Sequence, residues 1–222
     1  MLKRIPAPRA RKLIADASTL PTSDPRVSYP SWYVRRWHFL PEGYLSRRSA
    51  ALYEHIVRNL YNQGMEGRIV HNLVDRLRQI SPGSVLEVGC GPGRLLAASA
   101  RARIGHDRIG LDLSPFLLER ARRKVGNRAA RFVHGDGLAI PSEDSAFDAV
   151  VASHYVGHLP EAVRDQAVAE LARVVRPGGH LLVVDHRWHP WPSAPGLKLT
   201  NASSHNLGLI RVNVFERQES PA

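Results

Sequence analysis

The stretch VLEVGCGPG at residues 85–93 decides the fold of this chain. An apolar run passes directly into a turn with three glycines, and a helical pattern follows. Positions without side chains permit a tight turn and let the backbone approach a ligand closely, while the next helix offers unpaired N–H groups at its N-terminus. The spacing is G-x-G-x-G with Glu87 two residues ahead, whereas dinucleotide-binding proteins carry G-x-G-x-x-G. The stretch therefore predicts a strand, a ligand-binding turn and a helix, and it points away from NAD.

From this turn to the C-terminus, short β-rich runs alternate with helical segments. Such alternation is typical of βαβ units around a mostly parallel sheet, and the apolar strands suit a sheet covered on both faces. The chain ends in LKLT, a polar NASSHNLG stretch and IRVNVFER, which predicts two antiparallel strands joined by a turn. We expect strands at 84–89, 108–113, 130–135, 147–153 and 180–186, with helices near 93–103, 115–125 and 161–176.

The first 80 residues have a different character. Residues 1–45 are rich in proline, arginine and aromatic side chains without a clear period, so we expect an arm or cap with short turns there. Helices are expected to begin near Ser46, because apolar residues then recur at spacings of three and four over 46–63 and 65–80. We divide the chain into an N-terminal arm or cap, 1–45, and one α/β domain, 46–222.

Composition sets further bounds. Cys90 is the only cysteine, so an intramolecular disulfide and a cysteine-rich zinc site are excluded. The eleven histidines show no metal-ligand spacing, and we expect no metal. No apolar run reaches the roughly 20 residues that span a bilayer, so we expect a cytoplasmic protein, with peripheral membrane contact as an alternative. The formal charge of +11 favours anionic partners, but scattered surface arginine that binds nothing explains it equally well.

Five segments resemble, in order, the motifs of class I S-adenosylmethionine-dependent methyltransferases, in particular the broad group that contains ubiquinone-type enzymes. They are VLEVGCGPGRLL, IGLDLSP, FVHGDGLAIP, FDAVVASHYVGHLPE and LARVVRPGGHLLVVDH, and they cover roughly residues 84–186. The resemblance implies S-adenosylmethionine as cofactor and S-adenosylhomocysteine as product. It also implies the fold class: α/β, with a Rossmann-like, mostly parallel seven-stranded sheet, helices on both faces, an antiparallel C-terminal hairpin and an N-terminal helical cap.

The same resemblance assigns the cofactor site. It places Asp112 on the ribose hydroxyls, Asp136 on the adenine amino group, and the backbone N–H of Gly137 or Leu138 on a ring nitrogen. Gly137 departs from the usual alanine of the family, and Ser142 stands where many relatives have an aromatic residue. The expected cofactor-binding residues are Glu87, Gly89, Cys90, Gly91, Gly93, Asp112, Leu113, Asp136, Gly137, Leu138, Ser153 and His154.

Catalytic candidates follow from the chemistry that the resemblance implies. Methyl transfer from a sulfonium is an in-line displacement that positioning and desolvation accelerate, so a base is optional. Where the acceptor is a hydroxyl or a protonated amine, a nearby histidine can remove its proton. His154 and His158, just beyond the fourth strand, are the candidates, with His186 as a third. Tyr53 is a further candidate, because its helix resembles one that places a tyrosine near the methionine end of the cofactor; ordinary packing is the alternative for each.

Two aromatic and basic segments stand outside the family motifs, SWYVRRWHF at 31–39 and HRWHPWP at 186–192. Tryptophans of this kind suit a lid over an acceptor pocket, a membrane interface, or plain packing of the arm against the tail. The alternatives stay open at this point. The tryptophans concerned are Trp32, Trp37, Trp188 and Trp191.

The sequence thus predicts a methyltransferase that acts on an O or N atom of a small molecule or lipid. A phospholipid-headgroup N-methyltransferase is the nearest alternative, because basic charge and tryptophan suit an anionic bilayer. An RNA methyltransferase is disfavoured, since the sequence lacks the Asn/Asp-Pro-Pro-aromatic tetrad and the Pro-Cys nucleophile of base methylation. An S-adenosylmethionine-binding accessory protein is the non-enzymatic alternative. We expect a monomer or a homodimer.

Overall fold

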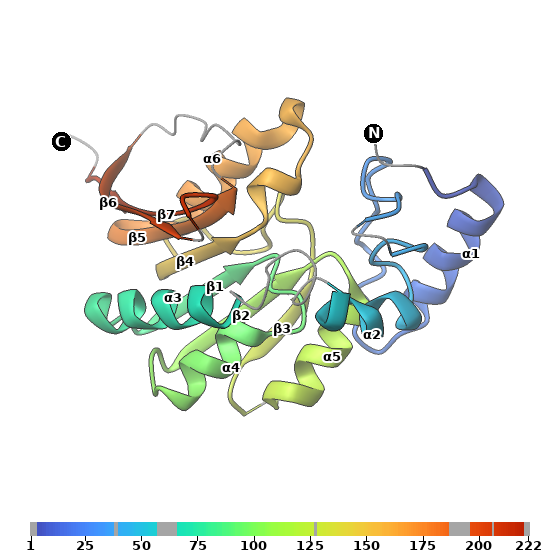
Figure 1. The fold of residues 1–222 in the computed structure, drawn as a ribbon, viewed down its shortest axis with the longest axis horizontal. Helices are drawn as coiled ribbons and strands as arrows, with labels where there is room; N and C mark the ends of the chain where they lie inside the picture. The colour runs from blue at the N-terminus through green and yellow to red at the C-terminus, as the bar shows by residue number, and fades with distance from the viewer. Residues whose placement is uncertain are drawn as a thin grey trace.

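The computed structural model describes residues 4–37, 40–56, 66–126, 128–186, 196–205 and 207–219. Its strands are β1 (Ser84–Val88), β2 (Asp107–Asp112), β3 (Arg131–His134), β4 (Phe147–Ser153), β5 (Val175–His186), β6 (Leu197–His205) and β7 (Ile210–Arg217). They form one seven-stranded sheet in the order β3-β2-β1-β4-β5-β7-β6 (Figure 1). The first five strands are parallel, and β7 pairs antiparallel with β5 and β6. The predicted sheet and its C-terminal hairpin are confirmed.

Strand order reverses between β1 and β4, at the centre of the sheet. The chain first winds outward from β1 through β2 to β3 and then returns to β4 on the other side of β1. In open α/β sheets, ligands bind beside such a reversal, outside the carboxyl ends of the strands. The glycine turn, residues 89–93, follows β1 at this edge.

Helices cover both faces of the sheet. The helices that follow or precede its strands are α3 (Glu66–Ile80), α4 (Arg94–Arg101), α5 (Pro115–Val125) and α6 (Arg164–Val174), with short 3-10 turns η2 (Val156–His158) and η3 (Glu161–Val163). Leu73 of α3 is buried with Val151 of β4 on one face, while Leu171 of α6 is buried with Val150 on the other. Successive strand residues point to opposite faces, so both layers are buried. None of the described helices is long and apolar enough to cross a membrane.

The N-terminal region contains a helix that the sequence pattern did not predict. α1 (Ala7–Ser18) precedes α2 (Arg47–Ile56), so the expectation that helices begin near Ser46 is wrong. Only Leu13 and Ala17 of α1 are buried, and a stripe of two apolar residues is too short to give a clear period. The predicted helix at 46–63 begins as expected, and its part beyond Ile56 lies outside the described residues. In Figure 1, α1 and α2 lie at the end of the molecule opposite β6.

Two strand boundaries also differ from prediction by more than one residue. β5 begins at Val175, five residues before the predicted start at 180, because Val175 already pairs with Phe147 ahead of an irregularity in β4. β6 includes the polar residues 201–205, which the sequence analysis placed in a turn. These residues pair in register with β7, and β6 is an edge strand whose side chains are mostly exposed, so polar residues are tolerated there. The division of the chain at residue 45 stays a prediction.

Candidate functional site

The glycine turn is held in a conformation that side chains disfavour. Gly89 has φ of 70° and Gly91 has φ of 52°, both in the left-handed region that glycine adopts without steric cost. The N–H groups of Gly89 and Cys90 both donate to the carbonyl oxygen of Leu111, at 2.8 and 3.0 Å. The turn is thereby fixed against the end of β2, where Asp112 follows.

Asp112 links the turn to the next helix. Its Oδ2 accepts the N–H of Gly91 at 2.8 Å, and its Oδ1 accepts the N–H of Ser114 at 2.8 Å. Ser114 in turn caps α5 by accepting the N–H of Leu117 at 3.2 Å. Burial raises the pKa of the Asp112 carboxyl to about 6, although its backbone hydrogen bonds oppose this shift. A carboxyl group with a pKa of about 6 thus lies at the carboxyl end of β2.

Asp136 lies in the loop after β3. Its Oδ1 accepts the N–H of Leu138 at 2.9 Å, and burial raises the pKa of its carboxyl. Because this hydrogen bond engages Leu138, the neighbouring N–H of Gly137 is the better candidate of the two for a ligand.

Tyr155 explains why residue 137 is glycine. A Cβ at Gly137 would lie 2.4 Å from the Tyr155 hydroxyl oxygen and 2.7 Å from Val88 Cγ1, distances that real side chains do not adopt. The Tyr155 ring also lies against Gly89, where a Cβ would be 3.2 Å from Cδ2. The departure from the family's alanine is therefore a local consequence of the tyrosine after β4, which the sequence analysis did not single out.

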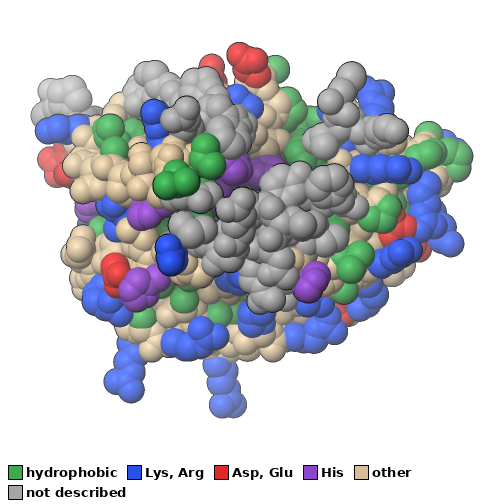
Figure 2. All heavy atoms as spheres, in the orientation of Figure 1, with side chains coloured by type: hydrophobic (Ala, Val, Ile, Leu, Met, Phe, Trp, Pro, Cys, Tyr) green, Lys and Arg blue, Asp and Glu red, His purple; other side chains and the backbone are tan. Residues whose placement is uncertain are grey.

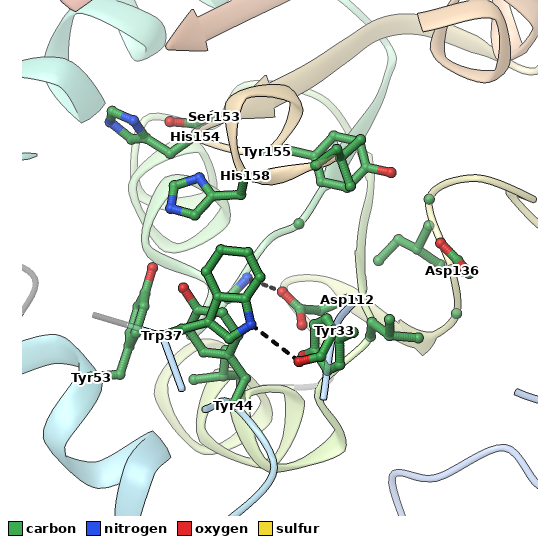
Figure 3. Close-up of a pocket in the computed structure, with 18 of the residues that line it drawn as sticks. Tyr33, Trp37, Tyr44, Tyr53, Asp112, Asp136, Ser153, His154, Tyr155 and His158 are labelled. Carbon is green, nitrogen blue, oxygen red and sulfur yellow. Dashed lines mark hydrogen bonds between the residues drawn. The ribbon is translucent and has the colours of Figure 1, made fainter. Parts of the chain in front are cut away.

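Histidines gather where β4 and β5 end. The rings of His154 and His186 have centroids 5.4 Å apart, and His158 lies with its ring 5.8 Å from that of Trp37. Figure 3 shows Ser153, His154 and His158 across from Tyr53 and Tyr44, and all five residues line the cavity.

Aromatic side chains of the N-terminal region form the opposite wall. The Tyr44 ring lies 6.0 Å from Tyr33, 6.1 Å from Trp37 and 5.6 Å from Tyr53, measured between centroids. Trp37 is only 8% exposed, and its Nε1 donates to the carbonyl of Tyr33 at 3.1 Å. Figure 3 shows Trp37 between Tyr44 and His158, inside the cavity. This position favours a lid over a membrane contact for Trp37; Trp188 and Trp191 lie outside the described residues.

Three hydrogen bonds fix this wall to the sheet domain. Ser114 Oγ donates to the carbonyl of Tyr44 at 2.6 Å, and Thr22 Oγ1 donates to the carbonyl of Pro115 at 2.9 Å. The N–H of Asp24 donates to Nδ1 of His134 at 2.9 Å. Each joins the N-terminal region to residues at the carboxyl ends of β2 and β3, so the aromatic wall is positioned by the same edge that carries Asp112.

These walls line two neighbouring hollows. The first hollow is lined by residues at the ends of the strands and by most of the aromatic wall. Those that line this hollow and not the second include Asp112, Asp136, Tyr155, Leu111, Leu113, Gly135, Gly137, Trp32, Tyr33 and Trp37. The second hollow is defined by Ile69, Leu73, Glu87, Cys90, Arg94 and His186. Both share Tyr44, Tyr53, Gly89, Gly91, Ser153, His154 and His158.

Most of the predicted site residues therefore meet at one edge of the sheet. Gly93 and Leu138 are not part of this lining. Gly93 is the N-cap residue before α4 and lies against α5, where a Cβ would be 3.1 Å from Ala121. The sequence analysis missed Tyr33, Tyr44 and Tyr155. The only signal for Tyr155 was its place within the fourth-strand motif, and nothing in the arm indicated that its tyrosines line the same hollow as Asp112. No group of three metal-ligating side chains was found within the described part of the chain.

Comparison with known proteins agrees with this geometry. Residues 85–179 match the family model Methyltransf_25, described as a methyltransferase domain. These residues are therefore similar to a methyltransferase domain. The match begins at β1 and ends in β5, so the matched segment contains the glycine turn, Asp112, Asp136 and the histidines after β4. S-adenosylmethionine is the cofactor of the family.

Individual relatives cover part of the chain. A demethylmenaquinone methyltransferase of Thermus thermophilus is 33% identical over 132 residues, 59% of this chain and 59% of that protein. A phthiotriol/phenolphthiotriol dimycocerosates methyltransferase of Mycobacterium leprae is 35% identical over 111 residues, 49% of this chain and 39% of that protein. The chain thus spans between 39% and 59% of the length of these curated relatives.

A solved structure shares the fold at lower identity. The magnesium protoporphyrin IX methyltransferase from Synechocystis, crystallised with bound S-adenosylmethionine, matches with a TM-score of 0.57 and 18% identity. The match covers 68% of this chain and 79% of that one. The sheet and its helices therefore share the fold of that protein.

Proposed function

We propose that this chain is a methyltransferase that moves a methyl group from S-adenosylmethionine to an O or N atom of a small molecule or lipid. The observation that carries the proposal is the convergence of Gly89, Asp112, Asp136 and Ser153 on one hollow. These residues follow or end four neighbouring parallel strands beside the reversal of strand order, where ligands of open α/β sheets bind.

The residues of the first hollow fit the cofactor. Each oxygen of Asp112 accepts one backbone N–H and keeps lone pairs for the ribose hydroxyls. Asp136 is suited to accept a hydrogen bond from the adenine amino group. We propose that the N–H of Gly137 donates a hydrogen bond to a ring nitrogen of adenine, because the N–H of Leu138 already donates to Asp136. The bare backbone of Gly89 leaves room for close approach.

The remaining roles belong to the side chains around the shared part of the two hollows. S-adenosylmethionine supplies a methyl group activated on a sulfonium sulfur. Trp37 and Tyr44 exclude water from this region, which strengthens electrostatic interactions there, and aromatic faces also attract a cation. His154 is the side chain that we assign to hold the proton of the acceptor, with His158 and Tyr53 positioning it.

The class of acceptor is proposed from two observations. The second hollow has an apolar side formed by Ile69 and Leu73 of α3, and two relatives are named for demethylmenaquinone and for phthiotriol dimycocerosates. Both features support an acceptor with an apolar body. A phospholipid headgroup is the alternative acceptor to be tested against this one, because Lys and Arg side chains are spread over the outer surface (Figure 2).

The first experiment is calorimetric titration with S-adenosylmethionine and S-adenosylhomocysteine. We expect micromolar binding that Asp112→Ala weakens tenfold or more, about 1.4 kcal/mol. Asp107→Ala is the matched control, because Asp107 is at the other end of β2, where it pairs with Arg131 outside the hollow. Absence of binding to either ligand in the wild type would end the methyltransferase proposal.

The second experiment identifies the acceptor class. Purified protein with labelled S-adenosylmethionine is screened against quinols, phenols, amines and phosphatidylethanolamine vesicles. Labelling of a quinol or phenol supports the apolar acceptor, whereas labelling confined to vesicles supports the headgroup variant. His154→Gln is expected to lower turnover at least tenfold while S-adenosylhomocysteine still binds.

A further inference from the structure

Two imidazoles lie side by side at the edge of the sheet. His154 follows β4 and His186 ends β5, and these strands are parallel neighbours in which Ser153 lies opposite Val184. The two ring centroids are 5.4 Å apart with an interplanar angle of 47°. Strand pairing therefore brings together two histidines that are 32 positions apart in the sequence.

The backbone at His154 is unusual. Its φ is 53°, in the left-handed region that few residues other than glycine adopt, although histidine enters it more readily than most. The His154 N–H donates to the carbonyl of Val184 at 2.7 Å, which fixes this turn to β5. Strained conformations of this kind cluster at functional sites. The turn places His154 in the lining of both hollows, while His186 lines the second.

Two imidazoles at this distance do not both take up a proton readily. An ordinary histidine has a pKa near 6.5, and a like charge within about 6 Å disfavours the second protonation. The pair is then expected to titrate in two steps that belong to both rings together. One ring stays neutral at pH values where an isolated histidine is already charged, so a proton acceptor remains available.

We propose that His186 is a positioning residue for His154 and that the pair receives the proton of the methyl acceptor. This inference rests on the proposed function and narrows it to acceptors whose reacting atom carries a proton, such as a phenol, an enol or a protonated amine. The reacting atom forms a bond to the methyl carbon while the carbon–sulfur bond breaks, its electron pair staying on sulfur. The acceptor's proton passes to a ring nitrogen of His154.

Other ionisable groups lie near the pair and contribute to the pH at which it titrates. Asp185 lies beside His186 on β5, and its carboxylate accepts the N–H groups of Gly157 and His186. Further groups line the second hollow with the pair: Glu87 from β1, Arg94 from α4, His158 from η2, Tyr53 from α2 and Tyr44 from the N-terminal region. These groups are unchanged when His186 alone is substituted. A comparison of the wild type with a His186 variant therefore isolates the electrostatic coupling between His154 and His186.

The coupling is tested by NMR titration of the histidine side chains in the free protein between pH 5 and 8.5. In the wild type we expect a two-step curve for His154, and in His186→Gln a single step with a higher midpoint. His154→Gln gives the reciprocal measurement on His186, should the first variant fold poorly. His180→Gln is the matched control, since His180 is on the same strand but far from the pair, and it should leave both curves unchanged.

A second titration asks whether the pair lies beside the reacting sulfur. S-adenosylmethionine carries a sulfonium charge that S-adenosylhomocysteine lacks, so we expect the midpoint of His154 to be lower with the former bound. Equal midpoints with the two ligands, or an unchanged one-step curve in wild type and His186→Gln, would overturn the inference. Failure of the proposed function is distinguishable, because then neither ligand binds at all.

Discussion

The two walls of the same cavity have different origins. One wall consists of strand ends and the turns that follow them, from Gly89 to His158, and its positions are set by the hydrogen bonds of a parallel sheet. The other consists of aromatic rings from residues 32–53, held to the first wall by a few hydrogen bonds such as that from Ser114 to Tyr44. We call these the sheet wall and the cap wall.

The difference between the two walls shows which part of the site is held in place by backbone hydrogen bonds of the sheet. Backbone pairing determines where Asp112 and Ser153 lie, so the cofactor side of the cavity follows from the fold. The cap wall depends on side-chain packing of α1 and its neighbours on Leu113 and Phe116. It is therefore the wall that we expect to loosen first, and the one free to differ in shape when the acceptor differs.

The largest expected difference is in stability. Leu182 is fully buried in β5, and Leu182→Ala should lower the global free energy of unfolding by about 3 kcal/mol. Leu13→Ala removes a buried side chain of α1 and should speed hydrogen exchange in residues 7–37 while the sheet amides keep their rates. Hydrogen exchange with mass spectrometry measures both. Equal acceleration in sheet and cap would show that the two walls unfold as one unit.

The next effect concerns cofactor affinity and pH. With a pKa of about 6, Asp112 is ionised above pH 6 and protonated below it. A neutral carboxyl accepts the ribose hydroxyls less well, so affinity for S-adenosylhomocysteine should be up to about tenfold lower at pH 5 than at pH 7.5. The Asp112→Asn side chain carries no charge at either pH, so the variant should lose the part of the pH dependence that comes from residue 112. Any pH dependence that comes from Asp136 is present in both proteins and cancels in the comparison. A flat calorimetric profile in the wild type contradicts the prediction.

A smaller effect should appear in the cap alone. His134 accepts the N–H of Asp24 on Nδ1, and burial lowers the pKa of His134. The open form of the cap then binds more protons than the closed form, so closure weakens as the pH falls below about 6.5. The hydrogen bond at stake is worth about 1 kcal/mol.

The measurement is exchange of the amides around Asp24 at pH 7.5 and 5.5, corrected for the intrinsic pH dependence of exchange. His134→Gln keeps an acceptor and a donor without titrating, and it should remove the difference. If wild type and variant respond alike, His134 does not control the docking of the cap.

The smallest expected effect is that of an ion pair between the two regions. Arg47 of α2 donates from Nη1 to both carboxylate oxygens of Glu119 on α5, at 2.7 and 2.6 Å. The Arg47 side chain is 60% exposed, so water screens the pair. A double-mutant cycle with Arg47→Ala and Glu119→Ala should give a coupling energy below about 1 kcal/mol in thermal unfolding. A larger value would mean that electrostatics, and not packing, holds the cap.

The sheet wall was largely predictable because its signals are local. Gly89, Asp112 and Asp136 lie at or within two residues of the end of a strand, and parallel strands bring their carboxyl ends to one edge. The prediction of a turn at residues 201–205 failed because it also relied on a local signal. An edge strand exposes its side chains, so its polar residues resemble those of a turn.

The sequence by itself therefore determined the α/β class, the positions of the parallel strands along the chain and the residues at their ends, because alternation and glycine spacing are imposed by backbone geometry over a few neighbouring positions. Only the tertiary structure decided that Tyr33 and Tyr44 line the same hollow as Asp112, that Tyr155 requires glycine at position 137, and that His154 lies beside His186. These contacts join residues that are 18 to 79 positions apart. Side-chain packing between such distant segments leaves no periodic trace along a single chain.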